Sequence, residues 1–232
     1  MITCLVDVYL DFFGCVRNRI ENNEGLKNRI YSLILFGSYV RGDFIDNVSD
    51  LDFFIVFNDG GEEHIPQLMK ILEACTPEIK YKLIDLPSAN INDLKNPLER
   101  EFPLKFLTFY RDDFLKNHRV VYGRDISDVL PSYDKETLIY SRAKQLSQAP
   151  ERFKDNIELL LLSAGETAKF EAVVSSTRSI SKKDITEALE KVGDKEALEI
   201  YSAYIEGKKI NLSYEYLSEF IITRVTNFLK KT

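Results

Sequence analysis

Apolar and polar positions follow two different periods along the first half of the chain. Residues 4–30 carry apolar side chains three and four positions apart, which predicts an opening helix. Residues 31–36 and 51–57 are short β-favouring runs and predict two strands. A helical pattern at residues 65–74 and a third apolar run at residues 79–86 come next. Because strands alternate with helices, this half is predicted to form an α/β unit.

The second half of the chain has a single pattern. From Lys135 onward glycine and proline are scarce, and apolar residues recur at helical spacing, which predicts a helical bundle. Residues 104–115, which precede it, fit a helix or a strand equally well by periodicity. We therefore expect two domains, at residues 1–133 and 134–232.

Composition narrows the class of protein. With 232 residues, of which 44% are hydrophobic, the chain can bury a sizeable core. No apolar run approaches the ~18 to 20 residues of a membrane span, and no basic segment precedes an apolar stretch at the start. Three cysteines, Cys4, Cys15 and Cys75, are odd in number and form no CxxC pair, which argues against a disulfide framework or a zinc site. We therefore expect reduced cysteines in a cytoplasmic protein that has no membrane partner.

The charge distribution argues against a nucleic-acid partner. The net charge is −6; residues 1–133 carry 21 acidic and 15 basic side chains, whereas residues 134–232 carry 16 of each. A non-specific nucleic-acid binder needs an excess of basic side chains to neutralise phosphates. Neither half has such an excess, so a nucleic acid is not expected to be the partner.

Two carboxylates stand at the start of the second predicted strand. Side chains two positions apart on a strand share a face, so Asp50 and Asp52 point the same way, about 7 Å apart. Their repulsion beside an apolar strand needs an offsetting cation, and hard oxygen ligands of this kind select Mg²⁺. The first predicted strand ends at Gly37, where a backbone without a Cβ can approach a phosphate and the Ser38 hydroxyl can donate a hydrogen bond. Together these features predict a nucleotide-binding metal site.

This arrangement resembles the signature of the polymerase β-like nucleotidyltransferase superfamily. The residues that carry the resemblance are Phe36, Gly37 and Ser38 and, after a gap of eleven residues, Asp50, Leu51, Asp52 and Phe53. The added Arg41, Gly42 and Ser49 match the longer form found in minimal and aminoglycoside-type nucleotidyltransferases. Residues 181–207 resemble the C-terminal helical domain of the aminoglycoside-type enzymes. The resemblance implies an α/β (α+β) nucleotidyltransferase domain with a small mixed sheet, followed by an α-helical bundle domain.

The resemblance also implies an activity and roles for individual residues. It implies transfer of a nucleoside monophosphate from an NTP, with ATP as the expected donor, to a hydroxyl of a small-molecule acceptor. Asp50 and Asp52 would hold Mg²⁺, while Ser38 and the amides after Gly37 would bind the β and γ phosphates. Arg41 either adds positive charge at the phosphates or forms a structural salt bridge with a nearby aspartate.

This chain differs from the family pattern at the position of the third acid. Relatives commonly place another carboxylate on the next strand, but in residues 81–86 Lys82 occupies that place. Asp85 lies three positions further on, which is the opposite face of an unbulged strand. A β-bulge can bring Asp85 to the site, or Glu166 or Glu171 of the helical domain can act as the base. Alternatively, Lys82 takes the place of the metal as a counter-ion near the nucleotide.

Several functions therefore stay open on the sequence alone. The leading hypothesis is an active nucleotidyltransferase whose catalytic residues are Asp50, Asp52 and Asp85 and whose acceptor is a small molecule. A second hypothesis is modification of a protein or of a tRNA end. A third is a nucleotide-binding pseudoenzyme or antitoxin-like partner protein, which Lys82 favours. The sequence does not define the oligomeric state.

Overall fold

Two compact units make up the chain. The structure is a computed structural model, and it describes residues 3–45, 49–75, 84–99, 102–175, 179–208 and 212–230. The first unit comprises Met1–Arg100 and Phe114–Pro131, and the second comprises Glu101–Asp113 and Ser132–Thr232. Residues 101–113 thus group with the second unit, although they precede residue 114 of the first unit in the chain.

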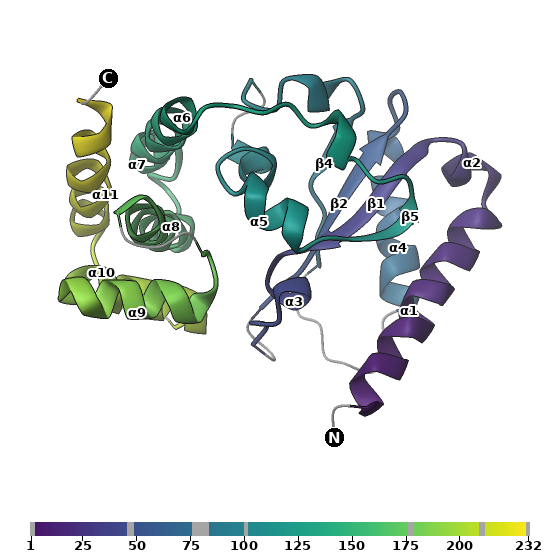
Figure 1. Cartoon of the computed structure of the whole chain (residues 1–232), viewed down its shortest axis with the longest axis horizontal. Helices are drawn as coiled ribbons and strands as arrows, with labels where there is room; N and C mark the ends of the chain where they lie inside the picture. The colour runs from purple at the N-terminus through teal and green to yellow at the C-terminus, as the bar shows by residue number, and fades with distance from the viewer. Residues whose placement is uncertain are drawn as a thin grey trace. The chain divides into compact units, whose positions relative to one another are not determined.

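A small mixed sheet forms the centre of the first unit (Figure 1). Its strands are β1 (Ile30–Phe36), β2 (Leu51–Phe57), β3 (Ile84–Asp85), β4 (Ser88–Asn90) and β5 (Arg119–Gly123). The strand order is β3-β2-β1-β5, and β4 also pairs with β2. β1 pairs antiparallel with β2 and β5, whereas β2 pairs in parallel with β3 and β4. The mixed sheet implied by the sequence is therefore confirmed.

Two α-helices of the first unit, α1 (Thr3–Glu21) and α4 (Ile65–Cys75), build its core with the sheet. The unit also contains α2 (Glu24–Lys27) and α3 (Gly37–Arg41). Leu33 of β1 and Phe53 of β2 share a buried cluster with Val16 of α1 and Leu72 of α4. Figure 1 shows α1 and α4 next to each other beside the sheet. Ile34, which alternates with Leu33, is also fully buried, and this two-sided burial explains the unbroken apolar run of β1.

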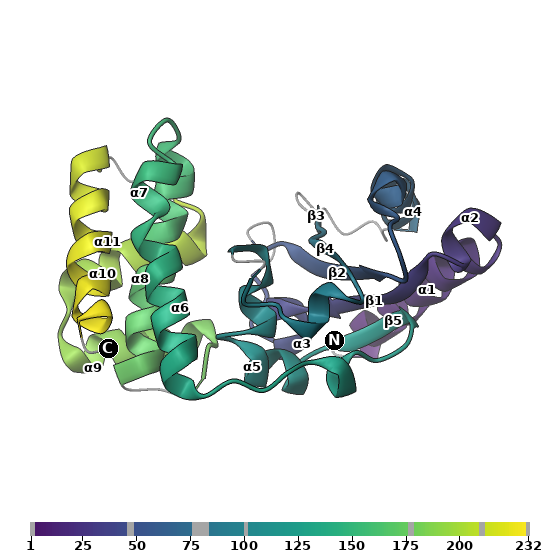
Figure 2. The ribbon, with the colours of Figure 1, turned by 90° about the horizontal axis from the view of Figure 1, so that it is seen from above.

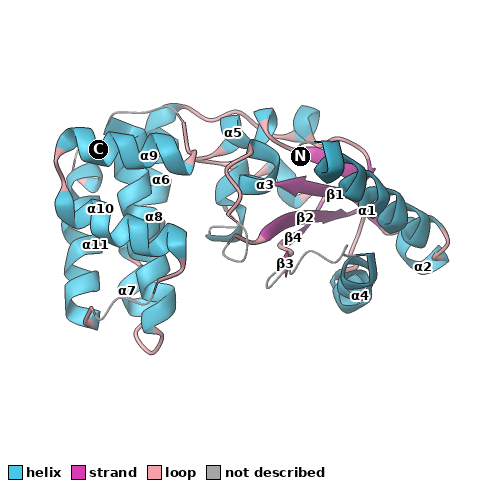
Figure 3. Ribbon diagram, turned by 90° about the horizontal axis from the view of Figure 1, so that it is seen from below, coloured by secondary structure: helices cyan, strands magenta, loops and turns pink. Residues whose placement is uncertain are grey.

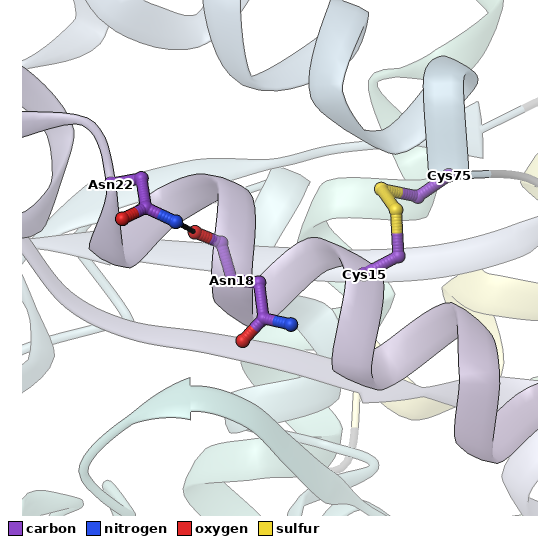
Figure 4. The surroundings of a disulfide bond; sticks show 4 residues. All are labelled: Cys15, Asn18, Asn22 and Cys75. Atoms are coloured by element: carbon purple, nitrogen blue, oxygen red, sulfur yellow. Dashed lines mark hydrogen bonds between the residues drawn. A yellow bond between two sulfur atoms is a disulfide. The ribbon is translucent and has the colours of Figure 1, made fainter.

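The opening helix is shorter than the sequence pattern predicts. A helix over residues 4–30 was expected, but α1 ends at Glu21 and the short α2 follows. The Asn22 side chain donates a hydrogen bond to the backbone oxygen of Asn18 at 2.8 Å (Figure 4). Asn23 then caps α2, because its side-chain oxygen accepts a hydrogen bond from the Leu26 N–H at 3.2 Å. Asparagine favours caps and turns over helix interiors, so this pair interrupts an otherwise helical pattern.

A disulfide joins α1 to α4 (Figure 4). It links Cys15 to Cys75, whose Cα atoms lie 5.7 Å apart although 60 residues separate them along the chain. The expectation that these cysteines stay reduced is therefore wrong for the structure. An odd number of cysteines without a CxxC pair does not indicate which residues meet, whereas the packing of α1 against α4 brings two of them within bonding distance.

Helices build the second unit, as the sequence predicts (Figure 2). They are α6 (Lys135–Ser147), α7 (Ala149–Arg152), α8 (Ile157–Ser175), α9 (Lys182–Val192), α10 (Lys195–Glu206) and α11 (Tyr214–Leu229). The central helix α8 contacts α9, α10 and α11. Its buried Leu160, Ala164 and Ala168 share a cluster with Ile200 of α10 and Ile221 of α11. Small residues on α8 therefore allow several helices to approach it.

The structure decides whether residues 104–115 form a helix or a strand, and it describes part of the strand predicted at residues 79–86. Residues 104–115 contain no strand; a 3₁₀ helix at Phe102–Leu107 is followed by a turn and then by α5 (Arg111–Lys116). Of the strand predicted at residues 79–86, Ile84–Asp85 forms β3 and Leu86 is not in a strand, while residues 76–83 lie outside the described part of the chain. Among the helices that the structure describes, none combines the length and the apolar character needed to cross a bilayer.

Candidate active site

The glycine turn and the acidic strand meet at one end of the sheet. β1 ends at Phe36, and α3 begins at Gly37, whose φ of 76° is in the left-handed region (Figure 3). A Cβ built on Gly37 would lie 2.0 Å from Oδ2 of Asp52 on β2. Only glycine allows this combination of backbone conformation and close approach. The sequence predicted these two residues as parts of one site, and the structure places them in contact.

Asp52 has a second acid beside it on the neighbouring strand. In the parallel pairing of β2 with β3, Asp52 is directly opposite Asp85, and in the antiparallel pairing with β1 it is opposite Phe36. Opposite residues on adjacent strands share a face, and the strands are about 4.8 Å apart. Asp85 is exposed, whereas Asp52 is half-buried. Asp85 therefore lies on the same face of the sheet as Asp52.

Hydrogen bonds between Ile45 and Ser49 hold the chain just before Asp50. The backbone N–H of Ile45 donates to Oγ of Ser49 at 2.9 Å, and the N–H of Ser49 donates to the oxygen of Ile45 at 2.8 Å. This pair of hydrogen bonds fixes the residue immediately before Asp50, which is itself half-buried and precedes β2. Ser49, a match to the longer family signature, therefore has a structural role in setting the start of the acidic strand.

The aspartate pair can serve as the protein part of a magnesium site. Within the described residues, no three His, Cys, Asp or Glu side chains come together as a metal-binding group. Mg²⁺ does not need such a group, since it commonly takes one or two carboxylates and completes its shell with water and substrate phosphates. Asp50 and Asp52, two positions apart at the entry to β2, match that requirement.

Ser38 and Arg41 are held by α3 and by the residues that follow it. Ser38 is only 8% exposed, and its backbone oxygen accepts hydrogen bonds from the N–H groups of Gly42 and Asp43, both at 3.0 Å. Nε of Arg41 donates to Oδ1 of Asp43 at 3.0 Å. Of the two roles considered for Arg41, the structural salt bridge is therefore present, with Asp43 as its partner. Asp46, a second aspartate near Arg41 in the sequence, lies outside the described residues, as does Lys82.

The alternative bases in the second unit are engaged in ion pairs there. Glu166 is 5% exposed; its carboxylate accepts hydrogen bonds from Arg142 at 2.8 Å, Tyr204 at 2.8 Å and Tyr110 at 3.3 Å. Glu171 accepts a hydrogen bond from Arg224 at 2.6 Å. These contacts favour a structural role for both glutamates.

Charge explains how a carboxylate can stay ionised at the Glu166 position. Burial on its own raises the pKa of Glu166, but the positive charges of Lys105, Lys169 and Arg142 outweigh burial and hold the pKa well below its ordinary value. The nearest cations include Lys105 Nζ at 3.2 Å. Sequence periodicity does not reveal this network, because its charged members come from three segments that periodicity does not connect. The available sequence signal was a charged residue within the apolar face of α8.

Comparisons with known proteins agree with this geometry. Residues 17–122 match the family model described as nucleotidyltransferase domain, and this range contains the glycine turn and the acidic strand. The fold is similar to the crystal structure of spectinomycin adenyltransferase AAD(9) from Enterococcus faecialis with ATP and spectinomycin. That likeness has a TM-score of 0.55 and 16% sequence identity, and it covers 92% of this chain and 96% of that chain. No curated protein matches the chain by sequence.

Proposed function

Because this chain is a nucleotidyltransferase of the polymerase β-like superfamily, with the fold of the aminoglycoside-type enzymes, we propose that it transfers AMP from ATP to a small-molecule hydroxyl. The observation that carries the proposal is the contact between Gly37 and Asp52, with Asp85 in register beside Asp52. A phosphate-approaching turn and a row of acids at one sheet end fit an NTP-dependent transfer. The ATP and spectinomycin of the similar structure support this choice of donor and acceptor class.

The proposed reaction needs a metal site, a phosphate site and a base. Asp50 and Asp52 would hold Mg²⁺, which when bound would neutralise the charge of the triphosphate and of the departing pyrophosphate. Ser38 and the backbone after Gly37 bind the β and γ phosphates. The acceptor oxygen attacks the α-phosphorus, the bond from that phosphorus to the α,β-bridging oxygen breaks, and pyrophosphate leaves with the electron pair. Asp85, which is exposed and next to Asp52, takes the proton of the acceptor hydroxyl.

We further propose that the enzyme works in the cytoplasm, where ATP is available. A nucleic-acid acceptor is disfavoured because neither half of the sequence has an excess of basic residues. Under reducing cytoplasmic conditions, the bond between Cys15 and Cys75 would be open to reduction. Its redox state in cells therefore provides an independent test of the location.

The activity is tested by following label from α-labelled ATP into a panel of hydroxyl-bearing small molecules that includes spectinomycin, with and without Mg²⁺. We expect transfer by the wild type and release of pyrophosphate. Asp50→Asn combined with Asp52→Asn should abolish Mg²⁺-dependent ATP binding in calorimetry, and Asp85→Asn should slow transfer by roughly 10²- to 10⁴-fold. Asp59→Asn is the matched control, because Asp59 is an exposed aspartate beyond the other end of β2.

Three results separate the alternatives. Unchanged Mg²⁺–ATP affinity in the doubly substituted protein would reject the metal site. Transfer that survives in Asp85→Asn would reject Asp85 as the base while leaving the activity intact. If the Lys82→Glu protein transfers label and the wild type does not, the natural chain binds nucleotide without efficient turnover. The proposed activity is then wrong.

A further inference from the structure

A pocket lies at the end of the sheet opposite to the candidate active site. It has a volume of about 500 Å³ and is lined by Tyr31 near the start of β1, Asn58 after β2 and the end of β5. The glycine turn, by contrast, follows the last residue of β1. Gly37 is six positions along the chain from Tyr31, and five of these steps run along β1, so the two residues are about 20 Å apart. The pocket is therefore distinct from the site formed with Asp52.

Positive charge dominates the walls of this pocket. Arg17 of α1 and Arg124 after β5 line it together with Lys27, and Glu21 is the only acid among the residues that line it. Lys27 is paired with Glu24, with 2.5 Å between Nζ and Oε1. Arg17 and Arg124 form no ion pair within the part of the chain that the structure describes. The two guanidinium groups are thus available to an anion, and guanidinium matches phosphate with two parallel hydrogen bonds.

The sheet fixes the position of Arg124 relative to an aromatic wall. Gly123 has a φ of 82°, and a Cβ built on it would lie 2.2 Å from the backbone oxygen of Tyr31. The N–H of Arg124 donates to the same oxygen at 3.0 Å. The guanidinium carbon of Arg124 then lies 5.9 Å from the centre of the Tyr31 ring. Tyr122 adds a second ring to the lining, so the pocket combines cations with aromatic surface.

We propose that this pocket binds a phosphate-bearing ligand, with Arg17 and Arg124 as its anion contacts. The volume is within the range of about 300 to 1,000 Å³ that small-molecule sites occupy. Phosphate is the group that both arginines can bind, whether it comes from a nucleotide or from inorganic pyrophosphate. A nucleotide would in addition place its base against Tyr31 or Tyr122. The proposal goes beyond the transferase activity, because none of these residues takes part in the candidate active site.

Calorimetry with ADP and with pyrophosphate tests the proposal. Both titrations use full-length protein with Asp50→Asn and Asp52→Asn, without Mg²⁺ and at low salt, so that metal-dependent binding at the other site is removed. We expect saturable binding that Arg17→Gln and Arg124→Gln each weaken by roughly ten- to a hundred-fold. Arg19→Gln is the matched control, because Arg19 is an exposed arginine of the same helix that does not line the pocket.

The two probes distinguish the sources of the phosphate. Tighter binding of ADP than of pyrophosphate, with loss in both arginine variants, supports a nucleotide ligand. Equal binding of the two probes, with the same losses, supports a ligand recognised by its phosphates alone. The proposal is overturned if neither probe binds, if binding does not respond to Arg17→Gln and Arg124→Gln, or if Arg19→Gln weakens it as much. None of these outcomes depends on whether the protein transfers AMP.

Discussion

Replacing Gly37 by alanine probes the contact on which the proposed active site rests. A Cβ at this position would lie 2.0 Å from Oδ2 and 2.7 Å from Cγ of Asp52. Non-bonded carbon and oxygen atoms need well over 3 Å, so the Asp52 carboxylate must move by more than about 1 Å. The φ of 76° adds about 1–2 kcal/mol of backbone strain for any residue with a Cβ. Displacement of a catalytic group by about 1 Å can lower a rate roughly 100-fold.

Gly42→Ala separates displacement from strain. Gly42 also has a positive φ, of 88°, but a Cβ built on it meets no atom within 4 Å. We therefore expect both variants to lose about 1–2 kcal/mol of unfolding free energy in guanidinium, whereas only Gly37→Ala loses roughly 100-fold in the rate of label transfer from α-labelled ATP. A Gly37→Ala rate close to that of Gly42→Ala would refute the reasoning, because the carboxylate would then tolerate the added methyl group.

Two further predictions concern stability. Cys15→Ser combined with Cys75→Ser should lower the unfolding free energy, measured by denaturant titration, by about 4 kcal/mol. This value is the loop entropy of a crosslink that spans 60 residues. An equal loss of stability in Cys4→Ser would contradict the prediction. Glu166→Gln should cost about 3–5 kcal/mol, since it leaves buried cations without their carboxylate, whereas Glu151→Gln on an exposed side chain should change little. Because the folded-state pKa of Glu166 is depressed, its stabilisation is present above the unfolded pKa and is lost as the pH falls through the folded pKa, so the wild type and Glu166→Gln should converge in acid.

The sequence alone determined the elements that are specified by residues close together along the chain. The bounds of β2 are those predicted, because an apolar run entered through carboxylates and left through an Asn-Asp-Gly turn specifies both its ends. The proximity of Gly37 to Asp52 was predictable as well, since the turn and the acidic strand each have a recognisable residue type at a fixed spacing. The helical character of the second unit followed from its uniform 3.6-residue period.

Tertiary structure decided the features that depend on which distant segments meet. The face on which Asp85 lies was set by its register with Asp52, because periodicity within one strand does not specify the neighbour against which it is aligned. Packing of α1 against α4 joined Cys15 to Cys75 across 60 residues. The charges around Glu166 came together in the same way, from segments whose sequences show no common pattern. Residue type and spacing fix local conformation, whereas the partner of a buried side chain is fixed only when the whole unit packs.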